Sequence, residues 1–96
     1  MDKKKLSDIL VKELDYSEYE ARVTANDLIN LQPRFQPALE KWATSREETE
    51  ISIGAISSIK LMRDKKMTYP AALIALDWVA TDPETAVPIL TSDIRQ

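Results

Sequence analysis

Gly54 is the only glycine in a chain of 96 residues, and this scarcity restricts the fold more than any other feature. Glycine supplies the tight turns of most β-hairpins, so a chain with a single glycine has few ways to build a large sheet. The length suits one domain. We therefore expect an all-α protein with a single helical domain over residues 1–96, a compact bundle of five or six short helices.

The first half of the chain carries the signals of three helices. Apolar residues recur at helical spacing from Leu6 to Leu14, which predicts a helix over 2–14. Residues 17–20, Ser-Glu-Tyr-Glu, form a capping-box pattern, and we expect a second helix from there to about Leu31. Pro37 is suited to the first turn of a third, short helix through Trp42.

The middle of the chain, residues 44–54, is predicted to be a loop. The alternation at 51–53, Ile-Ser-Ile, is typical of a short extended piece, and residues 45–48 match a capping box that could support one helical turn. The predicted fold requires no strand pairing. Ile56, Ile59 and Met62 then predict a helix that ends near Lys66.

A strongly apolar helix follows, and it is the centre of the predicted fold. Thr68 is a candidate N-cap, and nine of the ten residues 71–80 are apolar, so a central helix is expected near 69–81. A helix of this kind is either central to its domain or shared with a partner chain. Residues 82–84, Asp-Pro-Glu, begin a last helix that Pro88 limits or kinks. The residues expected to pack around the central helix are Leu6, Leu10, Leu28, Ile29, Leu39, Trp42, Ile59 and Met62.

The sequence lacks the residues of most catalytic and metal-binding sites. Cysteine and histidine are both absent, and no glycine-rich phosphate loop is present. Ser57 and Lys60 match the Ser-x-x-Lys spacing of some acylating enzymes, but the other motifs of those enzymes are absent, and we expect an N-capping serine followed by a solvated lysine. We expect no enzyme, no catalytic residues, no cofactor and no metal.

Charge and hydropathy bear on partners and location. The 13 basic and 16 acidic residues give a net charge of -3, whereas dedicated nucleic-acid binders usually carry a basic excess. No apolar run approaches the roughly 18 residues that cross a bilayer. The basic opening 1–5 is not followed by the apolar run of a signal peptide, because polar residues interrupt it from Ser7 to Glu13. We expect a cytoplasmic protein with no membrane partner.

The leading functional hypothesis is a small protein-interaction module that associates with itself as a homodimer or docks a partner helix. One helix is too apolar to expose, and a second helix carries apolar residues on the side opposite its core stripe. Asp77, the one charge within 71–80, is expected to pair with a cation from another helix. The candidate interaction residues are Tyr19, Val23, Leu73, Leu76, Asp77 and Val79.

The alternative hypothesis is a small DNA-associated regulator with a helix-turn-helix. Helices over 56–66 and 69–80 have suitable lengths, and the candidate nucleic-acid contacts are Lys60, Arg63, Lys65 and Lys66. However, residues 67–94 contain no lysine or arginine that could read DNA from the second helix. At 100° per residue the four cations are also expected to be spread around their helix, without a coherent basic face. A nucleic-acid partner is therefore disfavoured.

Overall fold

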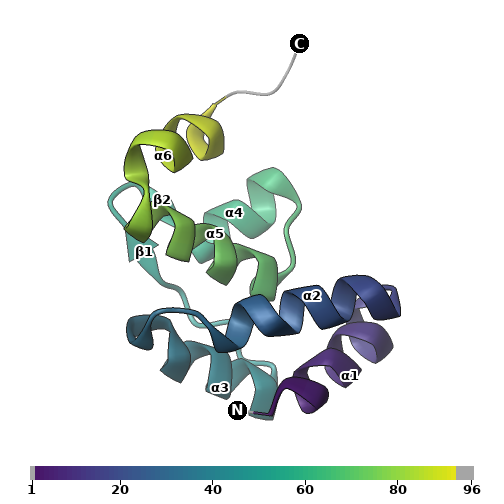
Figure 1. The fold of residues 1–96 in the computed structure, drawn as a ribbon. Helices are drawn as coiled ribbons and strands as arrows, with labels where there is room; N and C mark the ends of the chain where they lie inside the picture. Colours follow the sequence, from purple (N-terminus) through teal and green to yellow (C-terminus); the bar gives the residue numbers. More distant parts are fainter. Residues whose placement is uncertain (1, 93–96) are drawn as a thin grey trace. The chain divides into compact units, whose positions relative to one another are not determined.

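The computed structural model describes residues 2–92, and within them it contains six α-helices, one 3-10 turn and one small β-hairpin (Figure 1). The predicted all-α class is confirmed. Contacts within the chain group it into two compact units, Met1–Thr49 and Glu50–Gln96, and each is described by itself. The expectation of a single domain over 1–96 stays a prediction.

The first unit contains α1 (Lys3–Leu14), α2 (Glu18–Ile29), the 3-10 turn η1 (Pro33–Phe35) and α3 (Gln36–Ser45). The Asp2 side chain caps α1 by accepting a hydrogen bond from the backbone N–H of Lys4 at 3.0 Å. α1 and α2 pack side by side and bury the predicted Leu6 and Leu10 (Figure 1). Apolar periodicity therefore located the first helix correctly.

The predicted capping box of α2 is confirmed. Ser17 Oγ accepts from the backbone N–H of Glu20, and the backbone N–H of Ser17 donates to Glu20 Oε1, each at 3.1 Å. The helix ends at Ile29, two residues before the expected end at Leu31. Ile29 was expected in the core but is 36% exposed, because its position after Leu28 turns it off the buried stripe. Phe35, which the sequence analysis did not place in the core, is fully buried.

The chain reverses at Arg46, and the helical turn that the pattern at 45–48 could support does not form, so residues 46–51 lie in a loop as predicted for this segment. Arg46 adopts the left-handed conformation with φ of 62°, which ends α3. Its guanidinium donates to the carbonyl oxygen of Ala43 at 2.6 Å and is directed at the helix end. A residue in this conformation satisfies the last carbonyls of α3 and cannot open a new helix, so the capping-box match had no structural consequence.

The second unit begins with a small β-hairpin, which the predicted fold did not require. β1 (Ser52–Ile53) pairs antiparallel with β2 (Ile56–Ser57), and Gly54 turns the chain with φ of 60°. Two further bonds close the hairpin: the Ser58 N–H donates to Ile51 O at 2.8 Å, and Ser58 Oγ accepts from the Ile51 N–H at 3.0 Å. The single glycine of the chain is therefore used for the one strand reversal found in residues 2–92.

The hairpin shifts the start of the next helix. α4 (Ser58–Lys65) begins after β2 has taken Ile56 and Ser57, so its buried residues are Ser58 and Leu61. The predicted stripe of Ile56, Ile59 and Met62 is wrong as a helix face, since Ile56 lies in the strand and the other two are half-buried. The expected end near Lys66 is confirmed, because Lys66 is the left-handed C-cap.

The apolar helix α5 (Tyr69–Thr81) is the central element of the second unit, because it contacts α4, α6 and β1 (Figure 1). Thr68 caps it as predicted, with Oγ1 accepting from the Ala71 N–H at 3.3 Å. Its buried residues are Tyr69, Pro70, Ala72, Leu73, Ala75, Leu76 and Val79. In this chain the apolar helix is thus packed, which is one of the two outcomes that its composition allowed.

The last helix, α6 (Pro83–Thr91), starts at the predicted proline. Asp82 occupies the N-cap position, but its side chain makes no capping hydrogen bond. The helix continues past Pro88 to Thr91, because this proline is exposed and water can bond the carbonyl that loses its donor. Among the described residues, no helix combines the length and apolar character needed to span a membrane.

Candidate binding groove

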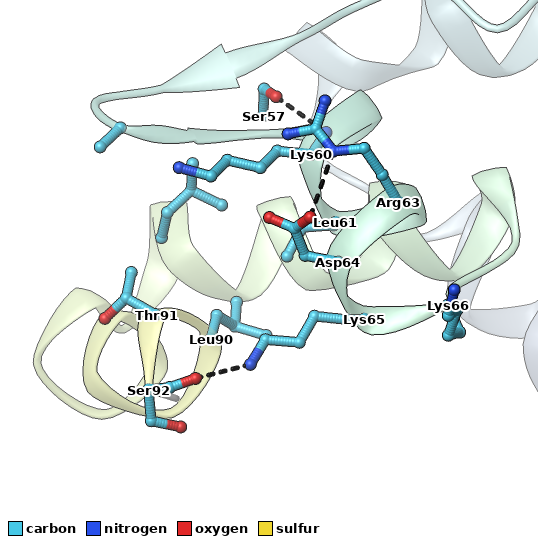
Figure 2. Close-up of a pocket in the computed structure, with 12 residues that line it drawn as sticks. Ser57, Lys60, Leu61, Arg63, Asp64, Lys65, Lys66, Leu90, Thr91 and Ser92 are labelled. Carbon is cyan, nitrogen blue, oxygen red and sulfur yellow. Dashed lines mark hydrogen bonds and ion pairs between the residues drawn. The ribbon is translucent and has the colours of Figure 1, made fainter. Parts of the chain in front are cut away.

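A groove of about 790 Å³ lies in the second unit, between the end of the β-hairpin, α4 and the last turn of α6 (Figure 2). We call it the α4 groove. Ile56, Leu61 and Leu90 form its apolar floor, and all three are buried. The other lining residues are Ala55, Ser57, Lys60, Arg63, Asp64, Lys65, Lys66, Thr91 and Ser92.

The rim of the α4 groove is strongly basic. It contains all four candidate nucleic-acid contacts, Lys60, Arg63, Lys65 and Lys66, with one carboxylate, Asp64. Four cations and one anion give the rim a charge of +3, whereas the whole chain carries -3. All four cations line the groove although they come from different positions around α4, because the groove extends along that helix to its C-cap. The expectation that they form no coherent basic face of the helix stays a prediction.

Two of the four cations are engaged within the groove. Lys65 Nζ donates to the backbone carbonyl oxygen of Ser92 at 2.8 Å, and Arg63 Nε lies 3.1 Å from Asp64 Oδ1 (Figure 2). Within residues 2–92, the ammonium groups of Lys60 and Lys66 have no ion-pair partner. These two ammonium groups are therefore available to an incoming anion.

Lys60 occupies a position that helix electrostatics does not favour. It is the third residue of α4, where the helix dipole favours acidic side chains. Arg63 and Lys65 lie in the last turn, where the same dipole favours cations and explains their presence without a ligand. Lys60 has no such explanation within its helix, which makes it the most informative cation of the groove.

Ser57 acts as the N-cap of α4, as predicted. Its Oγ accepts from the backbone N–H of Lys60 at 3.1 Å (Figure 2). The Ser-x-x-Lys spacing is therefore accounted for by a backbone cap at the start of the helix. Among the described residues, no group of three acidic side chains is arranged to hold a metal ion.

A second candidate surface lies in the first unit, on α2 and the turn before it. Tyr19 is 68% exposed and Val23 43% exposed. They border a shallow hollow of about 350 Å³, which we call the Tyr19 face, lined by Asp15, Tyr16, Tyr19, Glu20, Val23 and Thr24. This lining holds two carboxylates, and the guanidinium of Arg22 lies over the Tyr19 ring, 5.7 Å from its centroid, so the Tyr19 face carries charges of both signs.

The remaining candidate interaction residues do not lie on a free surface of this chain. Leu73, Leu76 and Val79 are buried in α5. Asp77 is half-buried and has an interaction within the chain. The α4–α5 connection has the short turn of a helix-turn-helix, but most of the second helix is buried and not available to a DNA groove.

No protein-family model, curated protein or solved structure matches this chain. The functional argument therefore rests on the geometry of the groove. The cations of the groove were identifiable from the sequence, whereas two floor residues, Leu61 and Leu90, and the carboxylate Asp64 were not. These residues belong to helices that meet only in the folded unit, and no local pattern links them.

Proposed function

We propose that this protein is a non-enzymatic protein-interaction module that binds an acidic segment of a partner protein in the α4 groove. The observation that carries the proposal is the rim charge of +3 above an apolar floor, in a chain whose net charge is -3. Lys60 and Lys66, which have no ion-pair partner within residues 2–92, offer charge-assisted hydrogen bonds to carboxylates. A cytoplasmic location and the absence of catalysis remain part of this proposal.

The rim cations define what the partner must carry. Lysine stems can cover apolar surface while their ammonium groups stay in water, so the rim and the floor together favour a segment with both acidic and apolar residues. An amphipathic helix with carboxylates along one edge meets this description. Complementary charge would mainly raise the association rate and set specificity.

Fluorescence anisotropy with a labelled synthetic peptide tests the proposal. The probe is an amphipathic helical peptide of Glu and Leu, and we expect binding at tens of micromolar in low salt, weakened at least about tenfold by roughly 0.5 M NaCl. The variant Lys60→Glu/Lys66→Glu should abolish binding. Lys3→Glu/Lys4→Glu is the matched control, because it makes the same charge change on exposed positions of α1 and should leave binding intact.

A nucleic-acid partner is the alternative outcome of the same experiment. A random DNA duplex at low salt should show no binding at tens of micromolar. Duplex binding that disappears in Lys60→Glu/Lys66→Glu, without peptide binding, would replace the proposed function by the DNA-associated one. Loss of peptide binding only in Lys3→Glu/Lys4→Glu would move the site to α1 and contradict the proposal.

A further inference from the structure

We infer that the acidic segment bound in the α4 groove is a helix of the partner that carries two carboxylates seven residues apart, with apolar residues between them on the same face. This inference rests on the proposed function and names the pattern that the groove recognises. All the groove residues that would recognise this pattern belong to the second unit, residues 50–96.

The first observation is the separation of Lys60 and Lys66, whose ammonium groups have no ion-pair partner within residues 2–92. Lys60 is the third residue of α4 and Lys66 is its C-cap, and Figure 2 shows the two side chains well apart. Six residues of helix place their α-carbons about 10 Å apart. A partner that pairs with both lysines therefore needs two carboxylates at a similar separation.

The part of the groove between these two lysines calls for apolar residues. Arg63 is already paired with Asp64 at 3.1 Å, and Lys65 holds the end of α6 through a backbone carbonyl at 2.8 Å. The buried floor lies alongside them, since Leu61 directly follows the first lysine and Leu90 belongs to the turn of α6 that Lys65 holds. The middle of the bound segment should therefore be apolar.

A helix matches this arrangement, whereas an extended segment does not. In a helix, residues seven apart lie on one face about 10.5 Å from each other, and the residues three and four positions after the first lie between them on that face. In an extended strand, residues on one face are about 6.6 or 13 Å apart, and neither value fits the two lysines. The partner segment should therefore be helical over at least about two turns.

Two peptides of identical composition test the inference. The matched peptide is an alanine-rich helix with glutamates at positions 1 and 8 of the recognised stretch and leucines at positions 4 and 5. Its isomer exchanges the leucine at position 5 with the glutamate at position 8, which brings the carboxylates to about 6 Å. Circular dichroism checks that both are helical. In fluorescence anisotropy, the matched peptide should bind at least about tenfold more tightly, because it alone can pair with both lysines.

Single substitutions in the protein identify the paired groups. Lys60→Gln and Lys66→Gln each remove one cation at an exposed position, so each should weaken the matched peptide and leave the two isomers within about twofold of each other. Lys3→Gln is the matched control, because it removes the same charge from an exposed position of α1 and should preserve the tenfold preference. A preference that survives both groove substitutions would contradict the assignment.

Three further outcomes would overturn the inference. Equal binding of the two isomers to the wild type, or tighter binding of the isomer, would show that the spacing is not recognised, and would leave the proposed function intact. Undiminished binding of a matched peptide with proline at position 6, off the recognised face, would show that the segment need not be helical. A wild type that binds neither isomer nor the Glu and Leu peptide would remove both proposals.

Discussion

Arg46, just after α3, pairs with Glu13 in the last turn of α1, which precedes it by 33 residues. Its guanidinium donates through Nε to Glu13 Oε1 at 2.7 Å and through a second nitrogen to Oε2. The same group stacks over Trp42, 5.6 Å from the ring centroid, and caps α3 through Ala43 O. One side chain therefore connects the end of α1 to the end of α3.

The Glu13–Arg46 pair should make the first unit sensitive to acid. The hydrogen bonds from Arg46, opposed by desolvation and assisted by its charge, lower the pKa of Glu13 from its usual value near 4.5. A carboxyl group with a lowered folded-state pKa contributes stability above its unfolded pKa and loses it as pH falls through the folded value. The difference in urea midpoint between wild type and Glu13→Gln should thus be present at pH 6 and vanish toward pH 3.

Glu40→Gln is the matched control for this titration, because Glu40 is exposed and has no ion pair among the described residues. Its urea midpoint should follow the wild type at every pH. A Glu13→Gln deficit that is equal at pH 6 and pH 3 would contradict the assigned role of the carboxylate charge.

Leu76 should behave as a core residue. It is fully buried in α5, so Leu76→Ala should lower the free energy of unfolding by about 2–5 kcal/mol, measured by urea denaturation. Leu76→Lys should unfold the chain. Ile89→Ala, at a position that is 54% exposed, should change stability by no more than about 0.5 kcal/mol. A folded Leu76→Lys monomer would instead place Leu76 at an interface between chains.

The Ser58 side chain should contribute more to the free energy of unfolding than the side chain of its neighbour Ser57. Ser58→Ala leaves the Ile51 N–H without its 3.0 Å acceptor beside a buried side chain, which should cost about 1–3 kcal/mol. Ser57→Ala removes an N-cap and should cost about 1 kcal/mol. Chemical denaturation of both variants compares them, and a larger loss for Ser57→Ala would argue against the closing role of Ser58.

Asp15→Gly should stabilise the protein. Asp15 is the left-handed C-cap of α1 with φ of 60°, a conformation that is strained for residues with a β-carbon. Relief of this strain, partly offset by the flexibility of glycine in the unfolded chain, should add about 0.5 kcal/mol and raise the melting temperature by about 2–4 °C. Asp15→Ala retains the strain and should give no gain. Equal melting temperatures for the two variants would show that the cap is not strained.

Local sequence signals predicted the helices well because their causes are local. The Ser17 capping box, the Ser57 and Thr68 caps and the end of α4 at Lys66 each depend on hydrogen bonds or backbone angles within a few residues. This dependence on neighbouring residues also explains why a local pattern can match without forming the structure it is typical of. Residues 45–48 match a capping box, but Arg46 is held in the left-handed conformation that ends α3.

The hairpin depends on a contact that spans more than one helical turn, and the α4 groove depends on contacts between residues distant in sequence. Ile51 pairs with Ser58 across a turn, and this pairing shifts α4 so that Leu61 becomes buried. Lys65 meets Ser92, 27 residues later, at the end of α6.

The sequence by itself therefore determined the helical class, the caps and the identity of the cations, because these depend on composition and on neighbours within one helical turn. Only the tertiary structure decided that Lys60 and Lys66 share one groove and that Leu73 and Leu76 are buried. The direction in which a helical side chain faces a partner depends on where the neighbouring helices pack, and that packing is set by the unit as a whole.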